Sequence, residues 1–290
     1  KEEVINETGV LEKPVLGADE DLMNYALSAA QRALTRSEIA AAEIDVIIFA
    51  GMGPWPKIHW SPASKLGSLL GSKAFCFEIQ NGCHSGVLAL NMAKQFLSGM
   101  AHLNNVLVVT ADALARSVDY SAKQVELFCM ADATAAVLVS RFPSKFKILE
   151  TSFATQSEFV DEIWAERADA IWKTNDSPEN DKKLSEAYRY QYNFQIRTAL
   201  ERSGKSLQDV KHVFMNQGDC RLIGRLSESL QLPREYFEVT YPQFGHLGSA
   251  DVFWGFSRRI ENAQIKSGDV MVLAASAVGF SWGACIVEAL

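Results

Sequence analysis

Short, β-rich apolar runs alternate with longer helical patterns along this chain, and this alternation restricts its fold more than any other feature. Alternation of this kind is typical of an α/β protein in which helices cover both faces of a sheet. The periodicity predicts strands at 45–50, 74–79, 106–110, 135–139, 213–215, 270–274 and 283–287. It predicts helices at 22–34, 87–100 and 250–265, and a further helix that closes at 194–200.

The pattern partly repeats after a break at Phe142-Pro143-Ser144. The run at 283–287, which ends the second half, resembles the run at 135–139, which ends the first. Two similar halves that each close on a buried strand predict an internal duplication. We expect one half at 1–143 and the other at 144–290.

The segment 157–183 joins the two halves and is rich in charged residues, but it also carries Trp164 and Trp172. A solvated helical connector is one interpretation. A cap over a substrate channel is the other, because exposed tryptophans usually mark a surface that covers or binds something. The sequence leaves both open.

The composition excludes several classes of protein. With 48% hydrophobic and 22% charged residues, the 290-residue chain is expected to fold. Its net charge of −7 argues against a nucleic-acid partner, and no apolar run approaches the roughly 20 residues that span a bilayer. The spacing of its five cysteines is typical of neither a disulfide framework nor a metal site, so we expect a cytoplasmic protein without a bound metal. The cysteines are Cys76, Cys83, Cys129, Cys220 and Cys285.

Cys83 is the best candidate for a reactive side chain. It lies in the glycine-flanked turn Asn81–Gly86, between the predicted strand at 74–79 and the predicted helix at 87–100. Backbone N–H groups and the dipole at the start of a helix favour a thiolate, and a thiolate attacks thioesters and other acyl donors. An inert, buried thiol is the alternative, because free cysteines are among the most buried residues.

Two later segments offer partners for this cysteine. Asn216 follows the predicted strand at 213–215, and His246 lies in a glycine-flanked loop before a helix. Active-site groups of parallel α/β proteins gather where strands end. We therefore expect His246 to act as a base and Asn216 to donate a hydrogen bond to an oxyanion. His84 is expected to be structural, because neighbours in a turn usually point apart.

Several segments in order along the chain carry a more specific signal. They are the cysteine turn at 81–86, the strand at 106–112, the Ala-Asp-Ala strand at 131–138, the segments 216–221 and 244–250, and Gly279-Phe280-Ser281-Trp282-Gly283. Together they resemble the motifs of the β-ketoacyl-ACP synthase III family within the thiolase superfamily. The resemblance covers nearly the whole chain and implies a thiolase-like, five-layered αβαβα fold built from two similar halves.

The chain departs from that family at the two partners of the cysteine. Family members carry Cys, His and Asn in that order, whereas the order here is Cys83, Asn216 and His246. Such an exchange keeps a Cys–His pair but moves the base to the other side of the pocket.

The resemblance implies an acyltransferase in which Cys83 takes an acyl group from an acyl-CoA or acyl-carrier-protein thioester. The group would pass to a carbon, oxygen or nitrogen nucleophile, in fatty-acid-like or secondary-metabolite biosynthesis. Backbone N–H groups of Cys83 and Val278 would form the oxyanion hole. No cofactor is expected beyond the CoA or phosphopantetheine of the substrate. Two alternatives stay open: decarboxylative condensation with a malonyl thioester, and a catalytically weak partner subunit of a heteromeric synthase.

The resemblance also implies substrate-binding residues and a homodimer. Trp60 would line the partner's acyl pocket, Phe280 would pack under the active-site loop, and Arg221 and Lys123 would face the pantetheine and nucleotide. A core position for Trp60 and merely solvated side chains for the two cations are the alternatives. A homodimer is expected because the predicted strand at 75–79 would otherwise leave an exposed sheet edge.

Overall fold

The computed structural model describes residues 8–53, 55, 57, 59–118, 129–166, 171–175, 177–218 and 221–290. One sheet comprises β1 (Val46–Gly51), β2 (Phe75–Gln80), β3 (Asn105–Ala113) and β4 (Asp132–Ser140). The other comprises β5 (Phe146–Thr155), β8 (Val210–Met215), β9 (Val270–Ala277) and β10 (Ser281–Ala289). The strand orders are β2-β1-β3-β4 and β5-β10-β9-β8, and a separate hairpin pairs β6 (Ile163–Ala165) with β7 (Trp172–Thr174).

Helices pack on both faces of these sheets. They are α2 (Leu22–Ser37), α3 (Pro62–Leu70), α4 (Ser85–Gly99), α5 (Pro178–Arg202), α6 (Leu222–Leu230), α7 (Tyr241–Phe244) and α8 (Asp251–Glu261). Short 3₁₀ turns are η1 (Ala41–Glu43), η2 (Gly82–His84), η4 (Ser157–Phe159), η5 (Leu207–Asp209), η6 (Arg234–Tyr236) and η7 (Gly248–Ala250).

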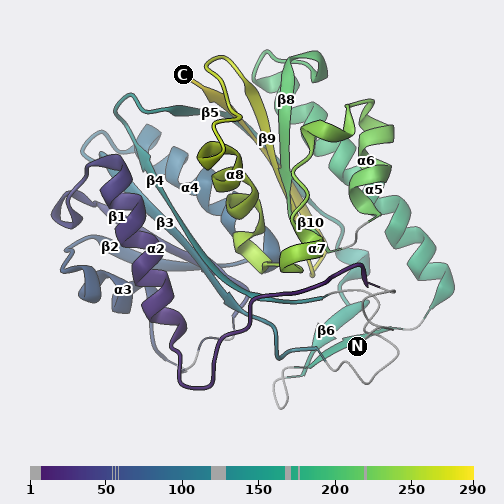
Figure 1. The fold of residues 1–290 in the computed structure, drawn as a ribbon, viewed down its shortest axis with the longest axis horizontal. Coiled ribbons are helices and arrows are strands. Elements are labelled where there is room, and N and C mark those ends of the chain that lie inside the picture. The colour runs from purple at the N-terminus through teal and green to yellow at the C-terminus, as the bar shows by residue number, and fades with distance from the viewer. Residues whose placement is uncertain are drawn as a thin grey trace.

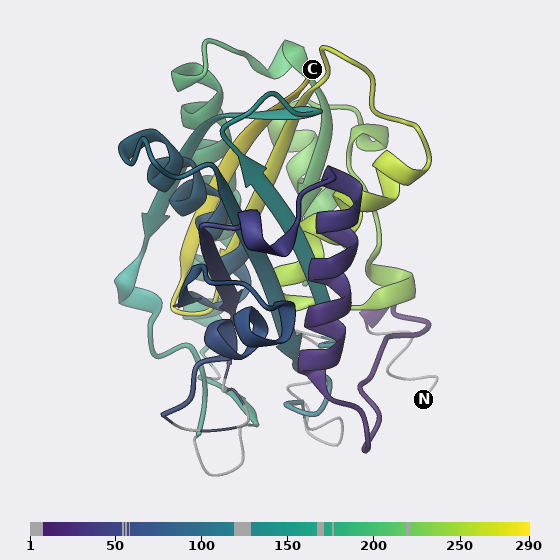
Figure 2. The same ribbon diagram turned by 90° about the vertical axis from the view of Figure 1, so that its left-hand side faces the viewer.

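The elements form five layers (Figure 1). The helices α2 and α3 lie on the outer face of the first sheet, where Figure 2 shows them in purple and blue. The helices α4 and α8 lie between the sheets, and α5 and α6 cover the outer face of the second. The expected five-layered α/β architecture is therefore confirmed.

Three strands of each sheet follow the same order and directions, whereas the fourth strand lies at a different edge, with β2 parallel to β1 and β5 antiparallel to β10. In the first, β1 pairs in parallel with β3, which pairs antiparallel with β4. In the second, β8 pairs in parallel with β9, which pairs antiparallel with β10. Each sheet uses only strands from one side of the break at 142–144, and this separation supports a division into 1–143 and 144–290, which we keep as a proposal.

The burial of α4 explains why its sequence is apolar on more than one face. Ala89 and Ala93 pack against the inner face of the first sheet. Val87 and Leu90 pack against residues of the second sheet. A helix enclosed between two sheets must be hydrophobic nearly all round. By contrast, α2 has one buried stripe, with Met23, Ala26, Ala30 and Leu34 at helical spacing.

The strand β2 lies at the edge of the first sheet, and Phe75 at its start is 63% exposed. The sequence-based expectation of a homodimer through this edge stays a prediction. Within the described ranges, every helix is too short or too polar to cross a membrane.

Candidate active site

Cys83 lies in η2, where the chain leaves β2 and enters α4. The turn packs closely against the end of β9. A Cβ atom on Gly82, whose φ is +54°, would lie 2.7 Å from the Cβ of Ala277. Only glycine fits this approach without strain. As a result Cys83 is 5% exposed and lies at the N-terminus of a buried helix, as the sequence predicted.

His246 is brought to the thiol by the loop that precedes α8. Its Nε2 atom lies 3.0 Å from Sγ of Cys83. The loop is held by backbone hydrogen bonds, in which the N–H of His246 donates to the carbonyl of Cys129 and the N–H of Ala131 donates to the carbonyl of His246. The imidazole is 2% exposed. Two residues that are 163 positions apart thus meet in a buried pair.

Asp251 contacts the other side of the same imidazole. Its Oδ2 atom lies 2.6 Å from Nδ1 of His246. The same oxygen also accepts hydrogen bonds from the backbone N–H groups of Gln217, at 3.0 Å, and Leu247, at 3.3 Å. Burial opposes a positive charge on His246, but the neighbouring Cys83 and Asp251 outweigh it and raise the pKa of His246 well above its usual value. A thiol, an imidazole and a carboxylate therefore form one row.

Asn216 lines the same cavity, but its amide binds the protein backbone. Its Nδ2 donates to the carbonyl of Ser276 at 2.9 Å, and its Oδ1 accepts from the N–H of Ser276 at 3.0 Å. The hydroxyl of Tyr192 lies 2.7 Å from the same Oδ1. The structure thus brings Asn216 to the site, where three hydrogen bonds fix the orientation of its side chain.

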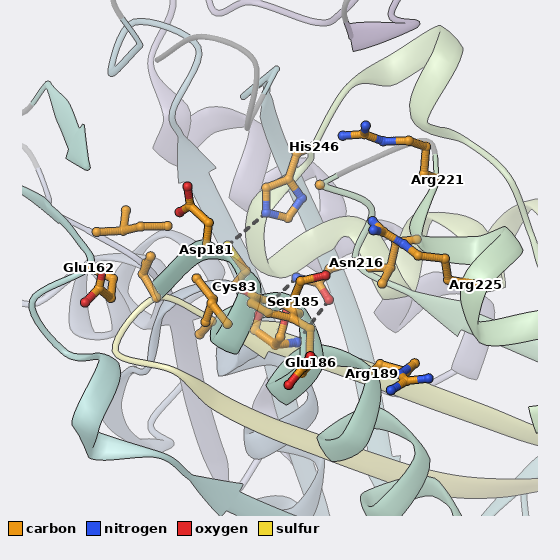
Figure 3. Close-up of a pocket in the computed structure, with 18 of the residues that line it drawn as sticks. Cys83, Glu162, Asp181, Ser185, Glu186, Arg189, Asn216, Arg221, Arg225 and His246 are labelled. Carbon is orange, nitrogen blue, oxygen red and sulfur yellow. Dashed lines mark hydrogen bonds between the residues drawn. The ribbon is translucent and has the colours of Figure 1, made fainter. Parts of the chain in front are cut away.

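A cavity of about 1030 Å³ connects the row to the surface. Its lining includes Cys83, His246, Asn216 and Val278, together with side chains of α5, α6 and the β6–β7 hairpin. In Figure 3, Arg189, Arg221 and Arg225 lie on one side of the row, and Glu162 and Asp181 lie on the other. The cavity offers a polar, charged route to the thiol.

The connector at 157–183 forms part of this cavity wall. Glu162, Ile163, Trp172 and Thr174 all line it. Trp172 donates a hydrogen bond from Nε1 to the hydroxyl of Ser117, at 2.8 Å, which ties the hairpin to the first half of the chain. Of the two interpretations of this segment, its position favours the cap.

Some of the remaining predicted site residues line the cavity, and others do not. Arg221 and Val278 line the cavity. Phe280 is 0% exposed and packs on Phe159 and Trp282, which agrees with the packing role expected for it, and it is not among the lining residues. Trp60 packs against the core beneath α2 and α3 and is not among the residues that line the cavity. Lys123 lies outside the described residues.

His84 is not among the residues that line the cavity beside Cys83 and His246. It is 1% exposed, its ring lies 5.3 Å from that of Phe153 at an angle of 53°, and Nδ1 lies 3.2 Å from Nδ2 of Asn81. Nε2 has no hydrogen-bond partner among the described residues, and a Cβ on Gly283 would lie 2.2 Å from it. Burial lowers the pKa of His84 to about 4, so the ring is neutral. Its structural role fits the sequence-based expectation.

Sequence reasoning missed one neighbour of His246 and one neighbour of Cys83. The first is Asp251, whose signal was an acidic residue five positions after His246, in the first turn of a predicted helix. The second is Met52, whose Sδ lies 3.3 Å from Sγ of Cys83. The backbone N–H of Met52 donates to the buried carboxylate of Asp112, which also accepts from Ser249 and so links this contact to the His246 loop. Among the residues that the structure describes, no cluster of His, Cys, Asp and Glu could hold a metal ion.

Gly86 lets the His246 loop lie against the first turn of α4. A Cβ at this position would lie 2.7 Å from the backbone oxygen of Ser249 and 2.8 Å from the ring of Phe253. We expect Gly86→Ala to lower the free energy of unfolding by about 1–3 kcal/mol, because the backbone must move. The matched control is Gly99→Ala at the end of the same helix, where nothing lies within 4 Å of the added atom. Urea unfolding of both variants checks this, and equal stability would contradict it.

Comparison with known proteins places the chain in a family. The family profile described as 3-oxoacyl-[acyl-carrier-protein (ACP)] synthase III matches residues 77–157, and the profile for the C-terminal part of the same enzymes matches residues 200–289. The β-ketoacyl-[acyl-carrier-protein] synthase III of Aquifex aeolicus is 26% identical over 287 residues, which span 98% of this chain and 89% of the relative. The enzyme of the same name from Methylococcus capsulatus is 27% identical, with the same two coverages.

Solved structures agree with the profiles. The crystal structure of 3-oxoacyl-[acyl-carrier-protein] synthase III from Aquifex aeolicus superposes with a TM-score of 0.88 at 26% identity, covering 99% of this chain and 90% of that one. Profiles in both halves and a full-length structural match point the same way. The chain belongs to the 3-oxoacyl-ACP synthase III family of acyl-transferring enzymes and has its thiolase-like fold.

Proposed function

We propose that Cys83 takes an acyl group from a thioester of CoA or of an acyl carrier protein and passes it to a second nucleophile. The observation that carries this proposal is the 3.0 Å contact between Sγ of Cys83 and Nε2 of His246 at the inner end of the cavity. A buried thiol next to a base is the arrangement that nucleophilic catalysis requires. The family to which the chain belongs supports the same chemistry.

In the first step the thiolate of Cys83 attacks the carbonyl carbon of the donor thioester. A new C–S bond forms to Cys83, and the C–S bond to the donor breaks. Nε2 of the protonated His246 gives its proton to the departing thiolate, so the donor leaves as a free thiol. The imidazole is then neutral and faces the acyl-enzyme as a base.

In the second step an acceptor attacks the acyl carbonyl. For an alcohol or amine, the new C–O or C–N bond forms while Nε2 of His246 takes the proton from the acceptor. The C–S bond then breaks, and Cys83 leaves as a thiolate beside the protonated imidazole. The products are an ester or amide and the enzyme in its starting state.

The oxyanion formed in both steps needs hydrogen-bond donors. We propose the backbone N–H groups of Cys83 and Val278, both of which belong to the cavity wall. Asn216 is the proposed third polar group, with the N–H of its Nδ2 that Ser276 does not use. Arg221 is the proposed contact for the phosphates of the donor. Trp60 is proposed to line the acyl pocket of the partner subunit in a homodimer.

Decarboxylative condensation with a malonyl thioester is the second candidate. The names of the relatives from Aquifex aeolicus and Methylococcus capsulatus support it. Condensation replaces the protic acceptor by a carbanion, whose enolate form needs two donors at its oxygen. The carboxamide of Asn216 spends its oxygen and one N–H on Ser276, which leaves one N–H of this side chain for the enolate oxygen, so a second donor would have to come from another group.

Intact-protein mass spectrometry tests the proposal. The protein is incubated with acetyl-, longer acyl- and malonyl-CoA and with the matching acyl-carrier-protein thioesters, beside Cys83→Ala. We expect a mass increase equal to the acyl group on the native protein and none on the variant. The donor that reacts identifies CoA or carrier protein. Release of carbon dioxide from the malonyl donor would favour condensation, and no adduct with any donor would overturn acyl transfer in favour of a catalytically weak partner subunit.

A further inference from the structure

We propose that Asp251 is a positioning residue, whose buried carboxylate holds His246 with Nε2 toward Cys83 and keeps the two as a thiolate–imidazolium pair. The inference concerns the resting enzyme, and it deepens the proposed function by assigning the group that prepares its base. It rests on the bonds around one carboxylate oxygen.

Three donors converge on Oδ2 of Asp251. Two are the backbone N–H groups of Gln217 and Leu247, and the third is Nδ1 of His246 at 2.6 Å. Because two fixed backbone groups orient the carboxylate, its hydrogen bond to Nδ1 fixes the plane of the imidazole. With the proton on Nδ1 held by Asp251, Nε2 is the nitrogen that exchanges protons with Cys83.

The burial of this carboxylate indicates more than a structural tie. The Asp251 side chain is 0% exposed, and Oδ1 has no hydrogen-bond partner among the described residues. A buried charge with one bare oxygen is costly unless an opposite charge lies beside it. Two backbone N–H bonds alone do not supply that charge, whereas a protonated His246 does. A purely structural role would be filled equally well by a neutral amide.

Other ionisable groups also face this pair from the elements packed around it. They are Asp112 from β3 and Tyr188 and Tyr192 from α5. Both tyrosines have their pKa raised by burial, and burial likewise raises the pKa of Asp112. The carboxylate in hydrogen-bond contact with the imidazole ring is that of Asp251, whose Oδ2 lies 2.6 Å from Nδ1.

Asp251→Asn tests the charge separately from the geometry. An asparagine has the same shape, and its oxygen can accept all three hydrogen bonds while its NH₂ group takes the place of Oδ1. The reaction measured is alkylation of Cys83 by iodoacetamide from pH 5 to pH 10, followed by peptide mapping. We expect the variant to react at least about tenfold more slowly than the native protein at pH 6 and at nearly the same rate at pH 10, where deprotonation needs no partner.

Asp45→Asn is the matched control. The carboxylate of Asp45 also accepts two backbone N–H groups, from Asn104 and Asn105, but it lies just before β1, at the opposite end of that strand from the Met52 contact. Its pH profile should coincide with that of the native protein. A profile of Asp251→Asn that also coincides with it would overturn the proposal and leave Asp251 a structural role.

A measurement on the native protein covers the case in which Asp251→Asn does not fold. The chain has five histidines, so selective ¹⁵N-histidine labelling gives few signals, and His246→Gln assigns one of them. We expect the ring of His246 to stay protonated above pH 7.5, and titration near pH 6.5 would overturn the proposal. Because neither alkylation nor titration uses an acyl donor, failure of the proposed acyl transfer leaves this test intact.

Discussion

We expect His246→Gln to slow acylation of Cys83 by roughly 100- to 10,000-fold, the usual contribution of a positioned acid–base group. This loss corresponds to about 3–5 kcal/mol in the activation barrier. The imidazole stabilises the attacking thiolate and then gives its proton to the leaving thiol through Nε2, which lies 3.0 Å from Sγ. A glutamine amide does neither, although its length lets it occupy much of the same space.

The acylation rate is measured by quenching the reaction at set times and determining the acylated fraction by intact-protein mass spectrometry. His102→Gln is the control, because His102 is exposed on the surface and outside the cavity lining. It should acylate at the native rate. A slowing of less than about tenfold in His246→Gln would show that another group handles the proton, and the proposed mechanism would lose its base.

The sequence predicted the two members of the buried Cys–His pair because each lies in a segment with its own local signal. Cys83 occupies a glycine-flanked turn between a strand and a helix, and His246 a glycine-flanked loop before another helix. Such turns occur where strands end in an α/β fold, so the alternation of elements also indicated that the two would meet. The 3.0 Å contact agrees with that reasoning.

Asp251 could not be predicted in the same way. An acidic residue in the first turn of a helix is common for a local reason, its favourable interaction with the helix dipole. Its contact with His246 depends on the bend at η7, and its fixed orientation depends on the N–H of Gln217 from a distant segment. Neither is visible in the spacing of residues along the chain.

The wall of the cavity could not be predicted from the sequence either, but for a different reason. The sequence predicted a helix that closes at 194–200 but not where it starts, whereas α5 begins at Pro178 and carries Tyr188, Arg189 and Tyr192 toward the site. The first half of this helix is largely polar, because it lines a cavity and faces solvent instead of a core.

The second large effect concerns acid stability and His84. Its pKa of about 4 lies below the value of about 6.5 expected in the unfolded chain. The folded state therefore binds this proton less readily than the unfolded state. The resulting stability is fully present above pH 6.5 and is lost as the pH falls through 4. The difference of about 2.5 pKa units corresponds to about 3 kcal/mol in the free energy of unfolding.

His84→Leu removes the titrating group and keeps an apolar side chain against Phe153. We expect the variant to be somewhat less stable than the native protein at pH 7.5, because Asn81 loses an acceptor, but to lose about 3 kcal/mol less between pH 6.5 and pH 4. Urea unfolding at several pH values measures both quantities. His102→Leu, which replaces an exposed histidine, should keep the native pH dependence.

Comparing how the free energy of unfolding changes with pH in the two proteins isolates the contribution of His84. Other buried groups, including the Cys83–His246 pair, titrate alike in the native protein and in His84→Leu, so their contributions cancel in the difference. If the two proteins lose the same stability between pH 6.5 and pH 4, His84 is protonated in the folded state without cost. That result would require solvent beside Nε2 of His84. In the structure Gly283 and Phe153 pack against the ring and leave no space for it, so this packing would be wrong.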